Sequence, residues 1–289
     1  MRFGGDRAAS GNTGFYGVVA MVAVAVAALG AAVCGGVLAT HAWSESRSND
    51  LDLSRFKLTF NEPFDTVDVS AWGPGTRWIA HTPWNGDFGD AQFVNPTPGF
   101  PFSAENGILK IEAKKGNDGK WRSGLLASTD HYGRGFSQQY GYFEMRAKLP
   151  KGPGLWPAFW LVGNADPDTS AELDVLEYYG RFPDMYQSVV HLFKKSARGR
   201  DYHNVLHNRV PVDSLWQGFH TYGALVDPDW IVLYLDRHEM ARTPTPPEFK
   251  RPLFILLNLA MGGGWPIDNA PNPSVMEVDY VRAYKRGDH

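Results

Sequence analysis

The sequence predicts an all-β fold made of two packed sheets. Between Leu51 and Arg286, apolar and polar residues alternate with the period of two that places successive side chains on opposite faces of a strand. No long stretch of this region has the 3.6-residue periodicity of a helix. The 31 glycines and 20 prolines are spread along the chain, as is typical of turns between strands. These patterns favour a sandwich of antiparallel sheets.

The N-terminal region differs in character from the rest of the chain. Two arginines precede an apolar run over residues 15–39, and a polar linker follows it. We expect residues 1–50 to be a signal peptide or a retained apolar anchor helix with its linker; both fates are open, because the run is longer than an ordinary signal-peptide core. Residues 51–289 would then form one domain outside the cytoplasm, secreted or anchored to the cytoplasmic membrane. The only membrane contact would be the N-terminal segment.

Composition is that of one globular domain. The chain has 289 residues, of which 43% are hydrophobic and 20% charged, so a single sandwich accommodates its length. The formal net charge is -3 and the pI about 6.3, so the chain lacks the basic stripe that nucleic-acid phosphates require. Nucleic acid is therefore excluded as a partner, and we expect a monomer.

Several strands are predicted from alternation alone. The first spans 107–115 and turns one apolar face to the core, formed by Leu109, Ile111 and Ala113. The next spans 141–149 with Phe143, Met145, Ala147 and Leu149 inward. Further strands are expected at 231–236 and 278–284. Three tryptophans are expected in the core: Trp121, Trp216 and Trp230.

Between these strands lies the most informative segment, an acid row of three carboxylates in an apolar run: Glu172, Asp174 and Glu177. In a regular strand, Glu172 and Asp174 share one face and Glu177 falls on the other. A β-bulge around Val175 and Leu176 adds one residue and returns Glu177 to the face of the other two. We therefore predict a bulged, bent strand with all three acids in a cleft.

Paired carboxylates are the groups that cleave glycosidic bonds, one as nucleophile and one as proton donor. Because like charges packed together cannot all ionise at neutral pH, the row itself keeps an acid protonated. A solvated surface strand is one alternative, but the apolar neighbours disfavour it. A calcium-binding cluster is another, but the ligand spacing of an EF-type loop is missing. No His and Cys set has zinc-ligand spacing, so catalysis is expected to need no cofactor.

The stretch from Gly154 to Gly180, Gly-Leu-Trp-Pro-Ala-Phe-Trp-Leu followed by Ala-Glu-Leu-Asp-Val-Leu-Glu-Tyr-Tyr-Gly, resembles glycoside hydrolase family 16 with its bulged signature E-x-D-x-x-E. Matching segments at 140–150, 219–222, 258–266 and 277–284 extend the likeness over roughly residues 52–286. The resemblance implies a curved β-jelly-roll sandwich of the concanavalin A-like lectin/glucanase type. It also implies endo-acting hydrolysis of β-linked glycans with retention of configuration.

Carried over by residue, the resemblance makes Glu172 the nucleophile, Asp174 its assistant and Glu177 the acid/base. It also implies that the strand with Glu144 and Arg146 borders the catalytic strand, with its polar face lining the cleft and binding sugar. For these two residues a surface ion pair is the alternative.

Aromatic side chains stack on sugar rings, and the chain has ten tryptophans. By position in the resemblance, the remaining substrate-binding candidates are Trp156, Trp160, His191, Asn258 and Trp265. His191 is expected to contact Glu177 or the sugar, with an ordinary satisfied histidine as the alternative. The family also suggests a structural calcium at Asp279, for which an ordinary strand-end acid is the alternative.

The expected partner is a polysaccharide. The loop 81–102 resembles that of enzymes acting on acidic bacterial exopolysaccharides such as succinoglycan, with plain β-1,3- or mixed-linkage β-1,3-1,4-glucan as the alternative substrate. Two other functions stay open. A transglycosylase uses the same covalent intermediate, and a non-catalytic glucan-binding module keeps the fold but not the acids. Retention of all three acids argues against the module.

Overall fold

The computed structural model describes residues 50–84, 86–163, 169–196 and 199–287. The predicted N-terminal export or anchor helix lies outside these residues. The helices within them are two short 3-10 turns, η1 (Leu53–Arg55) and η2 (Pro247–Phe249). No helix in the described part of the chain has the length and apolar character of a membrane span.

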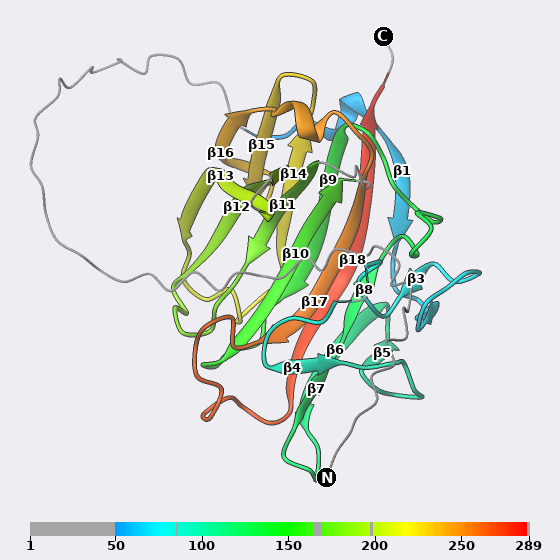
Figure 1. Cartoon of the computed structure of the whole chain (residues 1–289), viewed down its shortest axis with the longest axis vertical. Coiled ribbons are helices and arrows are strands. Elements are labelled where there is room, and N and C mark those ends of the chain that lie inside the picture. The colour runs from blue at the N-terminus through cyan, green and yellow to red at the C-terminus, as the bar shows by residue number, and fades with distance from the viewer. Residues whose placement is uncertain (1–49, 85, 164–168, 197–198, 288–289) are drawn as a thin grey trace, which may run out of the picture.

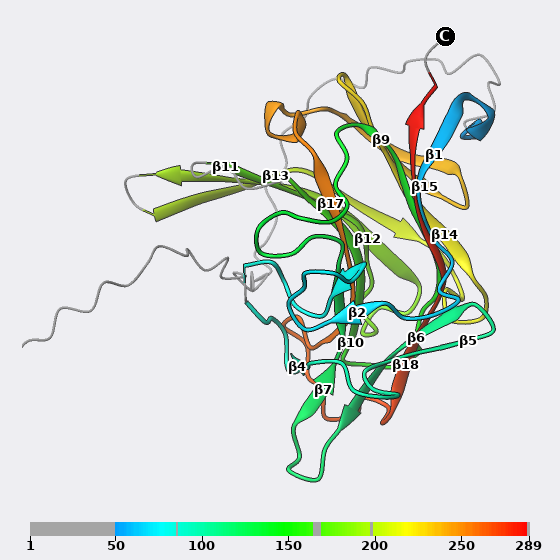
Figure 2. The same ribbon diagram turned by 90° about the vertical axis from the view of Figure 1, so that its right-hand side faces the viewer.

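Two sheets face each other as separate layers (Figures 1 and 2). The eight-stranded sheet has the order β13-β12-β11-β10-β17-β8-β3-β2. Its bounds are β2 (Val69–Ser70), β3 (Trp78–Ile79), β8 (Leu125–Ala127), β10 (Leu155–Gly163), β11 (Thr169–Glu177), β12 (Met185–Ser196), β13 (Gly199–Pro211) and β17 (Leu253–Met261). Because β13 is at the edge, its outer side has no neighbouring strand among the described residues.

The ten-stranded sheet has the path β16-β15-β14-β9-β18-β6-β7-β4, with β1 beside β18 and β5 beside β6. Its bounds are β1 (Phe56–Glu62), β4 (Ala91–Phe93), β5 (Phe102–Glu105), β6 (Ile108–Lys115), β7 (Trp121–Ser123), β9 (Gly141–Lys148), β14 (His220–Val226), β15 (Trp230–Leu235), β16 (His238–Pro244) and β18 (Ser274–Arg286). Figure 1 shows β1 alongside β18, so the two ends of the domain meet in this sheet.

The main core fills the space between the sheets, and the predicted alternation is confirmed. Leu109, Ile111 and Ala113 of β6 are fully buried there. The predicted inward set of β9 is also in this core: Phe143, Met145, Ala147 and Leu149. Burial of these side chains stabilises the sandwich by roughly 1.5–3 kcal/mol for each large aliphatic or aromatic residue.

Each sheet also carries an apolar cluster on its outer face. On the eight-stranded sheet this cluster includes Trp156 and Trp160, over which Trp84 and Phe88 pack. On the ten-stranded sheet the cluster is formed by Tyr142, Leu225, Val232 and Tyr234, with residues 51–56 packed against it.

The three tryptophans expected in the core have different environments. Trp121 is buried as predicted, and Trp216 is partly exposed with Lys151 over its ring. Trp230 is 41% exposed, so its prediction is wrong: it begins β15 at a turn and packs near Arg242 on the surface.

Candidate active site

The acid row lies on β11, and the predicted bulge is confirmed. On the β10 side, Phe159 pairs with Leu176 and Trp160 with Asp174, which leaves Val175 as an extra residue. The β12 pairing shifts at the same place, between Asp174 and Glu177. Val175 and Leu176 both enter the core between the sheets. All three acids therefore lie on the opposite, outer face of the eight-stranded sheet.

Asp174 is paired with His191 on the neighbouring strand β12. The carboxylate is 5% exposed and accepts a hydrogen bond from His191 Nε2 at 2.7 Å. On its other side, His191 Nδ1 lies 2.8 Å from Asn204 Oδ1 and 2.6 Å from the Tyr202 hydroxyl, both on β13. The expectation that His191 contacts Glu177 is wrong, because the strand register places it opposite Glu172 and beside Asp174.

His191 is the cation of the site. Burial alone would lower its pKa, but Asp174, with smaller contributions from Glu172 and Glu177, reverses this and raises the pKa to about 9. At neutral pH the ring is therefore protonated, and both of its nitrogens donate hydrogen bonds.

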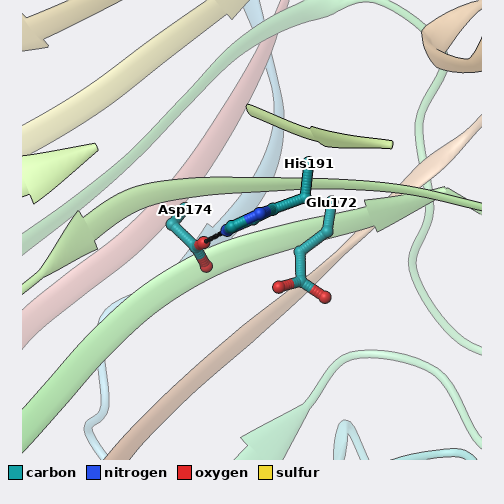
Figure 3. Close-up of side chains that lie close together, drawn as sticks. All are labelled: Glu172, Asp174 and His191. Carbon is teal, nitrogen blue, oxygen red and sulfur yellow. Dashed lines mark hydrogen bonds and ion pairs between the residues drawn. The ribbon is translucent and has the colours of Figure 1, made fainter. Parts of the chain in front are cut away.

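Glu172 lies beside the Asp174–His191 pair (Figure 3). One ligand atom from each of the three residues lies within 4.8 Å of the others. Burial raises the pKa of Glu172 to about 8, and the charge of Asp174 is the second cause. Glu172 as a whole is only partly buried, unlike Asp174 and Glu177.

Glu177 is 8% exposed and accepts hydrogen bonds only from uncharged donors among the described residues. Trp156 Nε1 (3.1 Å) and the Tyr179 hydroxyl (3.0 Å) donate to Oε1, and Gln187 Nε2 (2.9 Å) donates to Oε2. Burial, then Asp174, raises its pKa to about 7, and the donors Gln187 and Tyr179 offset part of the rise. The row thus holds at least one proton at neutral pH.

Trp156, Trp160 and Asn258 lie in the outer-face cluster beneath the acids. Trp160 Nε1 donates to Asn258 Oδ1 at 2.9 Å, and all three side chains are at most 6% exposed. The structure thus places them beside the acids, where Trp156 orients Glu177 and Asn258 holds the Trp160 ring.

Trp265 has a different environment. It is 38% exposed and packs edge-on against Phe182, with ring centroids 5.1 Å apart. The turn before it fits closely against the site: a Cβ on Gly263 would lie 2.6 Å from the Tyr179 ring and 2.9 Å from the Trp156 ring. Glycine, in its left-handed conformation (φ +62°), is required to seat this turn there.

The acid row and its fold agree with one family. Residues 98–282 match the family described as glycosyl hydrolases family 16. The chain belongs to glycosyl hydrolase family 16.

Individual relatives and solved structures agree with this family. The chain is 34% identical over 257 residues to endo-1,3-1,4-beta-glycanase ExsH of Rhizobium meliloti, covering 81% of this chain and 53% of that protein. It is 36% identical over 256 residues to endo-1,3-1,4-beta-glycanase EglC of the same organism, with the same coverage. The chain therefore spans about half the length of these relatives. Among solved structures, the family 16 non-specific endo-beta-1,3(4)-glucanase SCLam superposes with a TM-score of 0.65 at 27% identity, covering 81% of this chain and 92% of that one.

Two residues expected at this family 16 site lie elsewhere. Glu144 and Arg146 are on β9, whose neighbours are β14 and β18 of the ten-stranded sheet, so the expected border with the catalytic strand is wrong. Their side chains alternate with core residues and point to the outer face of that sheet, on the opposite side of the sandwich from the acids. Glu144 is fully buried and accepts hydrogen bonds from Arg237 and Tyr284.

Arg146 is paired with Asp279, the residue expected to hold calcium. The Arg146 guanidinium already supplies the positive charge that a calcium ion would bring, so the local chemistry does not fit the metal well. Among the described residues, the group of three close metal-ligand side chains is Glu172, Asp174 and His191 rather than any set at Asp279. Calcium binding stays a prediction.

The outer partners of the acids were not among the residues predicted from the sequence. Tyr179 stands two residues after Glu177, and this spacing alone places it on the same face of the strand. Gln187 likewise shares a strand face with His191 through the period of two. Asn204 and His207 follow from no local signal, because their contacts depend on how β13 pairs with β12.

Proposed function

We propose that this family 16 protein is an endo-acting, retaining β-glycanase. The observation that carries the proposal is the bulge at Val175, which brings Glu172, Asp174 and Glu177 to one face beside the protonated His191. Retained, buried acids of this kind raise the folding cost and are functional rather than structural. They disfavour a non-catalytic glucan-binding module.

The reaction proceeds in two displacements, with roles assigned by the family's motif. In the first, the Glu172 carboxylate attacks the anomeric carbon while Glu177 gives its proton to the departing glycosidic oxygen. A glycosyl–enzyme ester and a shortened chain result. In the second, the Glu177 carboxylate takes a proton from water as the water oxygen attacks the same carbon, which frees Glu172 and restores the original configuration.

These roles rest on the family's motif, because the raised pKa values, about 8 for Glu172 and about 7 for Glu177, would by themselves leave the proton on Glu172. The surroundings supply the shared proton that the first step needs. Asp174, which accepts a hydrogen bond from His191, places negative charge beside Glu172 and Glu177. This charge keeps a proton in the acid row. The donors around Glu177 hold its carboxylate after the proton has left, which supports the base of the second step.

The proposed substrate is a β-linked polysaccharide with 1,3 and 1,4 linkages, which the names of the two Rhizobium relatives give for those proteins. We propose an acidic bacterial exopolysaccharide of the succinoglycan type first and β-1,3- or mixed-linkage glucan second. The loop after β3 supports a substrate-shaping role, because its Phe88 packs edge-on against both Trp156 and Trp160.

A product profile tests the activity. The purified protein is incubated with a succinoglycan-type polymer, β-1,3-glucan and mixed-linkage glucan, and products are followed by size and by proton NMR of the new reducing end. We expect an early fall in chain length and first appearance of the β-anomer. First appearance of the α-anomer would contradict retention, and products longer than the substrate would identify a transglycosylase.

We also propose that the domain acts outside the cytoplasm, released or tethered by residues 15–39. Thr40-His41-Ala42 loosely fits the small-x-small pattern of a cleavage site. N-terminal sequencing of the extracytoplasmic protein is expected to start near Trp43 after cleavage, or at the intact N-terminus of an anchored form. Activity confined to the cytosol would refute export.

A further inference from the structure

Two chains of hydrogen bonds run from the acid row to the edge strand β13. Asp174 leads through His191 to Asn204 and Tyr202, as described above. Glu177 leads through Gln187 on β12 to His207 on β13, because His207 Nε2 lies 2.8 Å from Gln187 Oε1. The second chain ends at the proposed acid/base, and the two displacements as described give no role to its outer member, His207.

We propose that Gln187, oriented by His207, is a positioning residue that directs an N–H onto the Glu177 carboxylate and favours its ionised form in the second displacement. The proposal rests on the proposed function of the site. It gives a mechanistic role to His207, an exposed side chain on the edge strand β13.

The argument starts from the symmetry of an amide. A glutamine side chain can turn either its carbonyl or its NH2 group toward a neighbour. His207 removes this freedom by donating from Nε2 to the Gln187 oxygen, which leaves the NH2 group facing Glu177. Among the described residues, Gln187 is the donor to Glu177 Oε2, while Trp156 and Tyr179 both serve Oε1.

His207 is suited to act as a neutral donor. Its burial, followed by the charges of Arg209 and His191, lowers its pKa. A neutral ring with its proton on Nε2 makes the required bond to Gln187. The titratable groups that act on Glu177 are Asp174, His191, Tyr179 and the coupled Glu172, and a substitution at His207 removes none of them.

The consequence concerns the second displacement more than the first. A hydrogen bond to the anion favours the ionised form of Glu177. Without an oriented Gln187 the carboxylate holds its proton to higher pH, so the base of the second step is available only at higher pH. An aryl glycoside with an activated leaving group needs little acid assistance in the first step, so its first displacement should change little.

The test compares His207→Leu with His203→Leu in the full chain. His203 is exposed on the same strand but pairs in register with Leu192 rather than with the residues around Gln187. For His207→Leu we expect a three- to thirty-fold slower second displacement in burst kinetics, with the first nearly unchanged. The acid limb of the pH–kcat profile should move to higher pH.

Two further variants complete the design. His207→Gln restores a donor and should recover the wild-type profile. Gln187→Leu removes the N–H itself and should give the same pH profile as His207→Leu. Because the two leucine variants test the same hydrogen-bond chain, either one still tests the proposal if the other folds poorly. Equal profiles for His207→Leu and His203→Leu, or a wild-type profile for Gln187→Leu, would overturn the proposal. An inactive wild-type protein would instead refute the proposed function.

Discussion

The two outer faces of the sandwich each bury a glutamate, yet in opposite ways. Glu144, on the ten-stranded sheet, is fully buried and accepts hydrogen bonds from Nε (3.1 Å) and Nη2 (3.0 Å) of Arg237. Glu177, on the eight-stranded sheet, is 8% exposed and accepts hydrogen bonds from three uncharged side chains, those of Trp156, Tyr179 and Gln187.

The difference is one of partner charge rather than burial. A guanidinium compensates the charge of the Glu144 carboxylate, so this pair contributes to the fold. Burial, then the charge of Asp174, raises the pKa of Glu177 to about 7, and its uncharged donors offset only part of the rise. The buried glutamate that has no cation of its own among the described residues, Glu177, therefore lies on the face where proton transfer is proposed.

The largest expected effect is on activity. Glu172→Gln and Glu177→Gln should each lower kcat by roughly 10²–10⁴-fold or more, because each removes a reacting group without changing its shape. Glu144→Gln should keep kcat within about two-fold at temperatures where it stays folded, since it lies on the other face. Initial rates on a soluble β-glucan measure this.

Azide tests the identity of the nucleophile. It should partly rescue Glu172→Ala by attacking the anomeric carbon directly, giving a glycosyl azide of inverted configuration. An active Glu172→Gln protein would contradict the assignment of Glu172 as the nucleophile.

The second effect is on stability, and here the substitution at Glu144 should cost more than the substitution at Glu172. Glu144→Gln should lower the free energy of unfolding by about 1–3 kcal/mol, because it leaves Arg237 without its carboxylate; part of the loss is screened, since the Arg237 side chain is 39% exposed. Urea unfolding at pH 7 measures it. Glu172→Gln should show no such loss, and a comparable loss in both variants would remove the distinction between the faces.

The third effect is the pH dependence of unfolding. The pKa of Glu172 is raised from 4.5 to about 8 in the folded protein, so its contribution to stability is fully present below pH 4.5 and is lost as pH rises through about 8. Glu172→Gln should remove this loss and be more stable than the wild type at pH 8.5 by several kcal/mol, with an upper bound of roughly 5 kcal/mol for the full shift. Melting temperatures of both proteins from pH 5 to 9 test the sign, and parallel curves would contradict it.

The smallest effect concerns the surface of the ten-stranded sheet. Asp279→Asn breaks a partly exposed pair with Arg146, and should cost no more than about 1 kcal/mol. The same variant tests the predicted calcium. If a chelator lowers the melting temperature of the wild type but not of Asp279→Asn, the ion binds there; equal behaviour of both supports the ion pair alone.

The spacing of residues along single strands determined much of this protein in advance. Alternation predicted which side chains of β6 and β9 face the core, and the acid row predicted its own bulge at Val175 and Leu176, because a carboxylate on the apolar face would be too costly. Both patterns are local, since the direction of a side chain in a strand depends only on its position along that strand.

Which strands become neighbours was decided by the tertiary structure. Alternation correctly turned Glu144 and Arg146 away from the core, but it carried no information on which sheet β9 joins, so they were assigned to the wrong outer face. His207 reaches Gln187 for the same kind of reason, through the register of β12 with β13. A strand's sequence specifies its two faces, whereas its partners follow from long-range packing of the whole core, and partner charge separates the glutamate of the fold from the glutamates of the proposed reaction.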